Sequence, residues 1–338
     1  MMSDIVNAHP AALSLSELLT LQGARALLPG RISGAAYWRQ LGRPGPLIRA
    51  LANPDVAPDE FLYHRVDGGR FDPFRCPPIL AVTLPHLFAD PDRVFDALAP
   101  AIRAAPVQDR AAHTRHLITL LAAARGGAPR VWVERSGGAL LATRSLGRLF
   151  PEAGMVLLLR DGRDTVLSMQ RYKPARFVIW FWARARALGI DVLDPDAHLG
   201  RARWIAWAEV LGGRSLPLAR IMATPPPLQE VAGFWSAMTL AGIASWHALP
   251  AARRLALSYE EITADPAPHL ARLAAFLGLP EDRHWASRAA LIPQPRPARH
   301  LSLPPQERDA LTRWTAAAQD SARAALQEGA TPPADQRR

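Results

Sequence analysis

The sequence contains a single cysteine, Cys76, and a single lysine, Lys173, in 338 residues. One cysteine excludes a disulfide within the chain and a zinc site built from cysteines. We therefore expect Cys76 to be a reduced, inert thiol and the protein to be cytoplasmic, since thiols stay reduced there. No run of eighteen apolar residues occurs, which excludes a membrane-spanning helix. The first residues also lack the basic start and apolar block of a signal peptide.

Because lysine is nearly absent, the positive charge that gives a formal net charge of +10 is almost entirely arginine. These arginines are scattered along the chain, whereas nucleic-acid-binding proteins concentrate basic residues on one stripe, often among aromatic residues. The chain is also heavy in alanine and proline, as expected for a GC-rich genome. We expect no nucleic-acid partner, and an anionic small molecule agrees equally well with the charge.

Short apolar segments alternate with amphipathic segments along most of the chain. The expected strands are 77–85, 130–138, 154–164 and 253–262, and the expected helices are 1–8, 90–105, 111–126, 138–151, 164–172 and 267–280. Short apolar strands that alternate with helices predict a parallel sheet covered on both faces. The sequence therefore predicts an α/β protein.

We expect one domain over residues 1–325, followed by a disordered tail at 326–338. Within that domain, residues 174–250 are mostly helical in pattern and rich in tryptophan, which is typical of an insertion or a lid. Its tryptophans include Trp180, Trp182, Trp204, Trp207 and Trp235. Aromatic residues at this density usually form core, so we assign none of them to the binding of a substrate.

The most informative stretch is MVLLLRDGRDTVLSMQRY, residues 155–172, where a buried strand runs directly into a charged turn and a helix. Ligands of open α/β sheets bind beyond the carboxyl ends of the strands. Arg160 and Arg163 at the strand end and Ser168 in the helix can therefore converge on one anion. The helix N-terminus would add unpaired amides and a positive dipole end. The alternative is a solvated charged surface with an aspartate N-cap.

This stretch resembles a signature of the sulfotransferase family. In that family an arginine at a strand end and a serine eight residues later hold the 3′-phosphate of the donor, 3′-phosphoadenosine 5′-phosphosulfate, and Arg160 and Ser168 match that pair. A second match is LALSYEEITADPAPHLARLAAFLGLP (255–280), in which Tyr259 occupies the position whose ring lies beside the adenosine. A core tyrosine is the alternative for that residue. In the third match, residues 132–151, a polar strand end, a helix and Phe-Pro precede the phosphate motif.

The resemblance implies a P-loop NTPase-like three-layer α/β/α fold with a central, mainly parallel sheet. It also implies a sulfotransferase that moves a sulfonate from 3′-phosphoadenosine 5′-phosphosulfate to a hydroxyl or amine of a small-molecule acceptor, without a metal ion. A P-loop nucleotide kinase is one alternative, although no G-x-x-x-x-G-K-[ST] motif occurs in the chain. A sulfotransferase-like binding protein with impaired catalysis is another.

The family's other signature is an apolar strand, an Arg-Ser-Gly-Thr-Thr loop that wraps the 5′-phosphosulfate, and a helix. The nearest local match is GRISGAAYWRQ (30–40), which we reject because Ile32 and two alanines stand where the loop needs a base and hydroxyls. Residues 1–10, MMSDIVNAHP, resemble instead the helix that follows the loop. We therefore expect that the loop is missing from this chain, through a misassigned start codon or a deletion.

Glu17 and His86 are the candidates for the general base. In tyrosylprotein sulfotransferases a helix that ends in His-Pro is followed, eight residues after the histidine, by a catalytic glutamate, and here that count runs from His9 to Glu17. A carboxylate near the transferred group can remove the proton of an acceptor hydroxyl. The alternative is that Ser14 and Glu17 form a capping box at a helix start.

His86 follows the expected strand 77–85, and cytosolic sulfotransferases use a histidine in a comparable loop. A single histidine after a strand is more often structural. Arg135 ends the expected strand 130–138 and would contact the sulfonate or a phosphate of the donor. An ion pair between Glu134 and Arg135 is the alternative.

Overall fold

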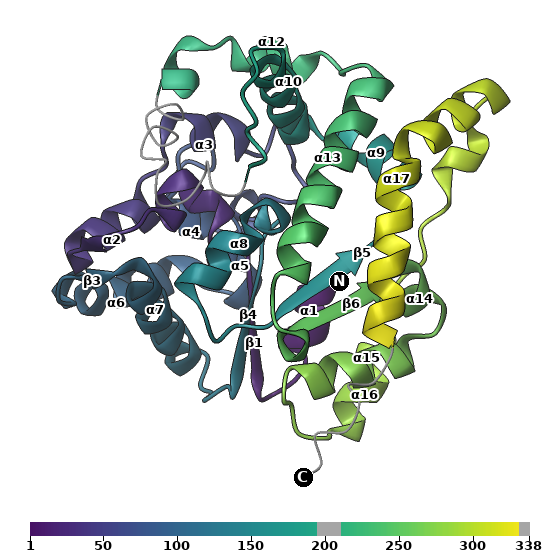
Figure 1. The fold of residues 1–338 in the computed structure, drawn as a ribbon. Helices are drawn as coiled ribbons and strands as arrows, with labels where there is room; N and C mark the ends of the chain where they lie inside the picture. The colour runs from purple at the N-terminus through teal and green to yellow at the C-terminus, as the bar shows by residue number, and fades with distance from the viewer. Residues whose placement is uncertain (195–210, 331–338) are drawn as a thin grey trace. The chain divides into compact units, whose positions relative to one another are not determined.

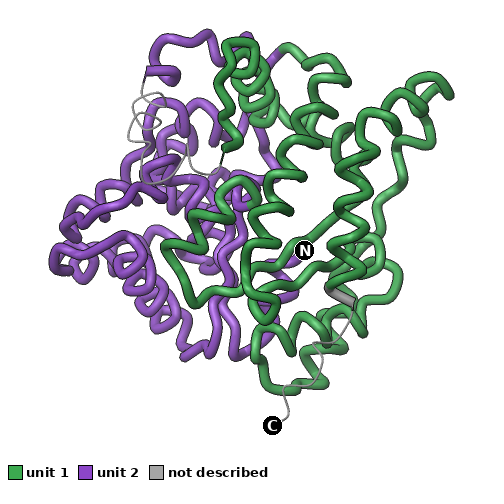
Figure 2. Tube along the Cα trace, in the orientation of Figure 1, with its two compact units in different colours: residues 1, 140–195, 224–338 green, residues 2–139, 196–223 purple. Residues whose placement is uncertain are grey.

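The computed structural model describes residues 1–194 and 211–330, and the chain divides into two compact units (Figures 1 and 2). Unit 1 comprises residues 1, 140–195 and 224–338, and unit 2 comprises residues 2–139 and 196–223. Each unit contains a pair of parallel strands with helices packed against it. The expectation of one domain over 1–325 stays a prediction.

Unit 2 is built around the parallel pair of strands β1 and β4. Its elements are α1 (Met2–Asn7), β1 (Ala12–Ser16), η1 (Thr20–Leu27), β2 (Arg31–Ile32), α2 (Gly34–Gly42), α3 (Pro46–Leu51), η2 (Tyr63–Arg65), α4 (Pro78–Ala81), α5 (Thr83–Leu87), α6 (Pro91–Ala104), β3 (Gln108–Asp109), α7 (Arg110–Ala124), β4 (Val131–Arg135) and α12 (Leu218–Ala223). The register runs from Ala12 opposite Val131 to Ser16 opposite Arg135. All five residues of β1 are buried.

The expected strand 77–85 is wrong, because this segment forms the short helices α4 and α5. Pro78 stands at the first turn of α4, where proline is favoured because the turn does not need its missing amide donor. Ile79, Leu80 and Leu84 are almost completely buried. A short apolar run without polar interruptions has no period that separates a buried strand from a buried helix.

Unit 1 is built around the parallel pair β5 and β6. Its elements are α8 (Ala139–Leu149), β5 (Met155–Leu159), α9 (Gly162–Arg171), α10 (Lys173–Ala187), α13 (Leu228–His247), η3 (Ala251–Arg253), β6 (Arg254–Ser258), α14 (Tyr259–Ala264), α15 (Pro266–Phe276), α16 (Arg283–Ala289), η4 (Arg299–Ser302) and α17 (Pro305–Ala330). The register runs from Met155 opposite Arg254 to Leu159 opposite Ser258. The expected strand 253–262 ends early because the Ser258 hydroxyl accepts a hydrogen bond from the Glu261 amide and caps α14.

Parallel strand pairs flanked by helices confirm the predicted α/β fold class, and the three-layer arrangement around one central sheet stays a prediction. Residues 174–194 and 211–250 are mostly helical, as expected. Trp204 and Trp207 of the predicted insertion lie outside the described residues. The tail was expected from residue 326, but α17 continues as a helix to Ala330.

Helix α9 is held in unit 1 by packing of α13 and α17 against it. Trp235 of α13 is buried and belongs to the same core cluster as Val166 of α9 and Leu311 of α17. Its indole lies so close to Gly162 that a Cβ built there would come within 2.1 Å of the ring. Position 162 must therefore be glycine for the start of α9 to approach α13 so closely.

We expect Gly162→Ala to destabilise the protein, because the added methyl group would lie 2.1 Å from the buried ring of Trp235. Overpacking of this kind typically costs about 1–3 kcal/mol, and alanine's better helix propensity offsets up to about 1 kcal/mol of it. The melting temperature measures the difference. Gly127→Ala is the matched control, since no atom lies within 4 Å of its added Cβ. Equal melting temperatures for the two variants would contradict the prediction.

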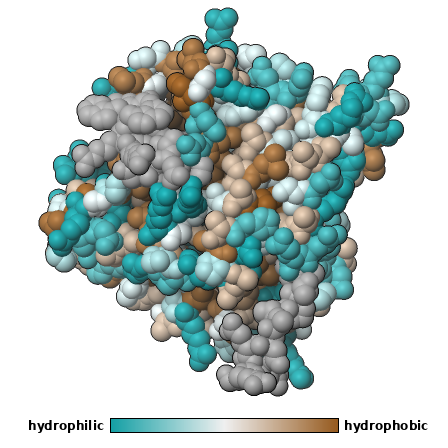
Figure 3. Space-filling model, viewed as in Figure 1, coloured by the Kyte–Doolittle hydropathy of each residue, from teal (hydrophilic) through white to brown (hydrophobic). Residues whose placement is uncertain are grey.

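The face shown in Figure 3 is largely hydrophilic, and the single cysteine is buried, as expected for an inert thiol. Figure 3 shows hydrophilic residues over much of the displayed face, with hydrophobic residues exposed in small groups. Among the described residues, no helix combines the length and the apolar character needed to cross a bilayer. Cys76 is buried, and burial raises the pKa of its thiol to about 12, so almost no thiolate exists near neutral pH.

Candidate functional site

In unit 2, polar side chains gather where β1 and β4 end, because the carboxyl ends of parallel strands meet at one edge of the pair. We call this group the Glu17 cluster. Its members are Ser3, Asp4, Ser16, Glu17, His86, Glu134, Arg135 and Ser136. Two of the residues predicted from the sequence, Glu17 and Arg135, contact each other here, with Nη1 of Arg135 3.5 Å from Oε1 of Glu17.

Glu17 directly follows β1 and has a backbone φ of +57°, the one positive value at a non-glycine residue in the described ranges. Residues other than glycine rarely adopt this left-handed conformation, and strained positions of this kind occur often at functional sites. The Glu17 amide donates to the carbonyl of Arg135 at 2.8 Å. The Gly137 amide donates to both carboxylate oxygens of Glu17, at 3.1 and 3.2 Å.

The Glu17 carboxylate is largely shielded from water, with 19% of its side chain exposed. Burial raises the pKa of Glu17, and this effect outweighs the lowering by Arg135 and by the Gly137 amide. A carboxylate with a raised pKa accepts a proton more readily than an ordinary glutamate does. Glu17 therefore combines partial burial, a neighbouring cation and increased basicity.

The capping box predicted as an alternative for Ser14 and Glu17 is wrong. Ser14 lies inside β1, and its buried hydroxyl has no hydrogen-bond partner within the part of the chain that the structure describes. Glu17 does bind a backbone amide near a helix start, but that amide belongs to Gly137, ahead of α8. Glu17→Gln can preserve such a contact, because the amide oxygen of glutamine also accepts hydrogen bonds.

Arg135 is positioned from two sides. Its Nε donates to the Ser3 hydroxyl at 2.9 Å, and that hydroxyl also accepts a hydrogen bond from Ser16 at 2.9 Å. Because Arg135 pairs with Glu17, the predicted alternative of a pair between Glu134 and Arg135 is not what the structure contains. Nothing in the sequence pattern singled out Ser3, which reaches Arg135 only through the packing of α1 on β1.

His86 lies in α5 rather than in a loop after a strand. Its Nε2 is 3.0 Å from Oδ1 of Asp4, and 19% of the His86 side chain is exposed. Its Nδ1 is buried without a hydrogen-bond partner among the described residues. Asp4 orients the imidazole, so the second candidate base is held by α1, the same helix that supplies Ser3. Asp4 is a further residue that sequence reasoning did not assign.

Glu134 is the member of the cluster with the largest pKa shift. Burial raises the pKa of its carboxyl from 4.5 to about 7, against smaller lowering effects of its hydrogen bonds. Oε1 of Glu134 accepts hydrogen bonds from the Ser136 hydroxyl and, at 3.2 Å, from the Leu19 amide. Near neutral pH a substantial fraction of this carboxyl is therefore protonated.

The raised pKa of Glu134 predicts a pH-dependent stability. The fold favours the protonated carboxyl, so this contribution is complete below pH 4.5 and is lost as the pH rises through about 7. Each unit of pKa difference corresponds to about 1.4 kcal/mol. In Glu134→Gln the neutral amide persists at every pH, so we expect the variant to lose less stability than the parent between pH 5 and pH 8.

Urea unfolding at the two pH values measures this difference. Glu281→Gln, which removes an exposed carboxyl, is the control and should follow the parent. Parallel pH profiles for the parent and Glu134→Gln would show that the Glu134 carboxyl titrates normally in the folded protein.

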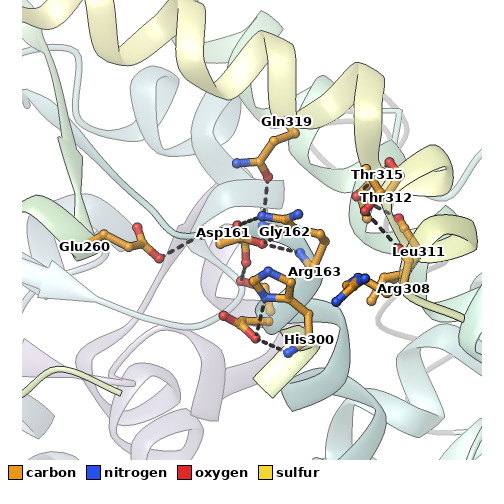
Figure 4. Close-up of polar contacts among 12 residues, drawn as sticks. Asp161, Gly162, Arg163, Glu260, His300, Arg308, Leu311, Thr312, Thr315 and Gln319 are labelled. Carbon is orange, nitrogen blue, oxygen red and sulfur yellow. Dashed lines mark hydrogen bonds and ion pairs between the residues drawn. The ribbon is translucent and has the colours of Figure 1, made fainter. Parts of the chain in front are cut away.

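In unit 1, the first amides of α9 are paired with the protein's own side chains (Figure 4). The Asp161 amide donates to Oε1 of Glu260 at 3.0 Å, and the Gly162 amide donates to Oε1 of Gln319 at 2.8 Å. The Arg163 amide donates to Oδ1 of Asp161 at 2.8 Å. The expectation that these amides are unpaired is therefore wrong. Gln319 lies 157 residues beyond Gly162 in the chain, and no local pattern predicts that contact.

Arg163 and Asp161 form an ion pair with Nη2 2.6 Å from Oδ2. Burial alone would raise the pKa of the Asp161 carboxyl, but the hydrogen bonds from the side chain and amide of Arg163 outweigh it and lower that pKa. Ligand atoms of Asp161, Asp164 and His300 lie within 4.8 Å of one another, as in many metal sites. Both Asp161 oxygens already accept hydrogen bonds from Arg163, and Oδ1 of Asp164 accepts the His300 amide at 3.0 Å. The guanidinium of Arg163 thus supplies the positive charge that this acidic pair needs.

Arg160, at the end of β5, differs from Arg163. Its guanidinium carbon lies 5.1 Å from the centre of the Tyr259 ring, and within residues 1–194 and 211–330 it has no carboxylate partner. The Tyr259 hydroxyl donates to the carbonyl of Gln294 at 2.8 Å, which fixes the ring. Ser168 lies on α9 with its side chain exposed. Arg160 is therefore a cation beside a fixed aromatic ring and is not neutralised by its neighbours.

The predicted site residues thus fall into two groups. Glu17, Arg135 and His86 lie in unit 2, and the structure connects them through α1. The residues predicted to hold the donor nucleotide, namely Arg160, Arg163, Ser168 and Tyr259, lie in unit 1. Within that second group, Arg160 lies over the ring of Tyr259. Arg163 forms an ion pair with Asp161.

No protein-family model and no curated protein matches this chain. Among solved structures, the chain is similar to a sulfotransferase domain from the curacin biosynthetic pathway. The two are 14% identical, with a TM-score of 0.41 over 88% of this chain and 74% of that domain.

Proposed function

We propose that this protein is a sulfotransferase that moves a sulfonate from 3′-phosphoadenosine 5′-phosphosulfate to a hydroxyl or amine of a small-molecule acceptor. The observation that carries the proposal is the state of Glu17. This residue is strained, partly buried and paired with Arg135, and burial raises the pKa of its carboxyl. The sequence motifs around Arg160 and Tyr259 support the identity of the donor.

In the proposed reaction, Glu17 removes the proton of the acceptor hydroxyl as the oxygen attacks the sulfur of the donor. The new oxygen–sulfur bond forms while the bond from sulfur to the phosphate oxygen breaks, and the electron pair of that bond stays on the phosphate. The product nucleotide is 3′-phosphoadenosine 5′-phosphate. Catalysis of this kind consists mainly of positioning and electrostatic stabilisation, and we propose that it uses no metal ion.

Arg135 and Arg160 have different roles in this proposal. Arg135 is held by Ser3 and is proposed to attract the anionic sulfonate or phosphate to the neighbourhood of Glu17. Arg160 is proposed to hold the 3′-phosphate, because its guanidinium is not neutralised by a neighbouring carboxylate in the described ranges. Tyr259 would stack on the adenine, and the Ser168 hydroxyl would add a neutral hydrogen bond to the 3′-phosphate. Arg163 is a weaker candidate for phosphate binding, since Asp161 already neutralises it.

The test compares two nucleotides that differ in one group. We expect 3′-phosphoadenosine 5′-phosphate to bind at least about tenfold more tightly than adenosine 5′-monophosphate in calorimetry, because only the former offers a 3′-phosphate to Arg160. Turnover is then measured as release of 3′-phosphoadenosine 5′-phosphate from the donor with phenolic and aliphatic alcohols. Equal affinities for the two nucleotides would overturn the proposed donor. Tight binding without turnover would favour the alternative of a non-catalytic binding protein.

A further inference from the structure

Unit 2 contains a cavity of about 330 Å³ that is lined mainly by arginines and lies apart from the Glu17 cluster. Its wall is formed by η1, β2, α2 and the first residue of α7. The lining residues are Arg25, Ile32, Ala36, Arg39, Gln40, Arg43 and Arg110. A volume of this size is at the lower end of the range for small-molecule sites, about 300–1,000 Å³. Four arginines and no acidic residue line it.

None of these four arginines forms an ion pair with a residue that the structure describes. Arg25 lies close to the backbone of Gly45, with Nη2 3.3 Å from the position that a Cβ would take there. Arg39 and Arg43 are exposed. Four cations that share one concave surface repel one another unless an anion lies among them. The cavity therefore has the charge of an anion-binding site.

The residues of α2 that line the cavity lie on one face of this helix. Ala36, Arg39 and Gln40 are spaced three and four residues apart, which aligns them along one side of the helix, and Arg43 directly follows the last residue of α2. Arginines near a helix C-terminus are also favoured by the helix dipole, and that effect accounts for Arg39 and Arg43 without a ligand. It does not account for Arg110, which is the first residue of α7, where the helix dipole disfavours a cation, and which faces the same cavity.

Arg110 is fixed in place and has donors to spare. Its Nη1 donates to the carbonyls of Leu28, Pro29 and Gly30, at 2.9, 3.3 and 3.3 Å. Its Nε is buried without a hydrogen-bond partner among the described residues. Burial also lowers the pKa of the Arg110 guanidinium, so the fold disfavours this charge in the absence of an anion. Arg110 is therefore a fixed, half-buried cation in the wall of the cavity, without a carboxylate partner among the described residues.

We propose that this cavity binds a small organic molecule that carries two phosphate groups. Guanidinium groups match phosphate oxygens with paired, charge-assisted hydrogen bonds. Four arginines balance about three to four negative charges, which is the charge of two phosphates near neutral pH. Ile32 and Ala36 offer an apolar wall to the organic part of the ligand. The site does not depend on the proposed transfer reaction, since it contains none of the residues assigned to it.

The test uses inorganic pyrophosphate as the probe, with calorimetry on the full chain. Because each hydrogen bond to a charged group is worth about tenfold or more in affinity, we expect the double variant Arg39→Gln/Arg43→Gln to bind pyrophosphate at least about tenfold more weakly. Both positions are exposed, so the variant should keep the parent's melting temperature. The control is Arg93→Gln/Arg103→Gln, which removes the same charge from exposed positions on α6.

Three outcomes would overturn the proposal. The parent could fail to bind pyrophosphate, or both double variants could lose affinity equally, which would mean that only the net charge matters. Orthophosphate could also bind as tightly as pyrophosphate, which would exclude a site for two phosphates. A separate comparison with Arg160→Ala distinguishes this cavity from the proposed donor site. In the Arg160→Ala background, Arg39→Gln/Arg43→Gln should still weaken pyrophosphate at least about tenfold, whatever Arg160→Ala does to 3′-phosphoadenosine 5′-phosphate.

Discussion

Glu17→Gln should reduce sulfonate transfer by about 10²–10⁴-fold, the loss typical of removing a general base. Glutamine keeps the size of the side chain and can still accept the hydrogen bond of the Gly137 amide, which lies 3.1 Å from Oε1 of Glu17. It cannot take a proton from an acceptor hydroxyl at neutral pH. The melting temperature and the affinity for 3′-phosphoadenosine 5′-phosphate should therefore stay near those of the parent while turnover falls.

The pH dependence of the parent supplies a second readout of Glu17. A general base works only when it is deprotonated, so the rate should rise with pH through the pKa of Glu17, which burial raises above that of an ordinary glutamate. Glu307→Gln, at an exposed position of α17, should leave both the rate and the profile unchanged. Turnover of Glu17→Gln within about threefold of the parent, short of the loss expected for a base, would assign Glu17 a structural role. His86 with its partner Asp4 would then be the base to test.

Segments whose period is unambiguous could be predicted from the sequence. The strand 155–159, the helix that follows it and the strand 131–135 are where the pattern placed them within a few residues. The strand that positions Glu17 was missed, although Leu13 and Leu15 alternate with Ser14 and Ser16 in the two-residue period of a strand. Serine three residues before glutamate also matches a capping box, and the two patterns cannot be separated locally.

The candidate site could be predicted residue by residue, but its contacts could not. The sequence placed both Arg160 and Arg163 among the residues expected to hold the donor, whereas the structure pairs Arg163 with Asp161. The difference arises because the Asp161 carboxylate accepts hydrogen bonds from both the amide and the guanidinium of Arg163. Glu260 and Gln319 reach the first amides of α9 from 99 and 157 residues away along the chain. Contacts that depend on packing of distant elements leave no periodic signal in a single sequence.

Arg160→Ala should weaken binding of 3′-phosphoadenosine 5′-phosphate by about tenfold to a hundredfold, because a hydrogen bond to a charged group contributes about 1.5–3 kcal/mol. Adenosine 5′-monophosphate has no 3′-phosphate and should bind the variant and the parent almost equally. The Tyr259 ring should remain in place without the guanidinium, since its hydroxyl is tied to the carbonyl of Gln294. Calorimetry with both nucleotides measures the two affinities on the same protein.

Two further variants show whether the loss belongs to Arg160 or to charge in general. Arg171→Ala removes an exposed cation from the other end of α9 and should leave both nucleotides bound as in the parent. Arg163→Ala should weaken 3′-phosphoadenosine 5′-phosphate less than Arg160→Ala does, because Asp161 already holds its guanidinium. It should instead lower the melting temperature, since Asp161 and Asp164 lose the cation beside them. If Arg160→Ala weakens both nucleotides to the same extent, its guanidinium supports the Tyr259 ring and does not bind the 3′-phosphate.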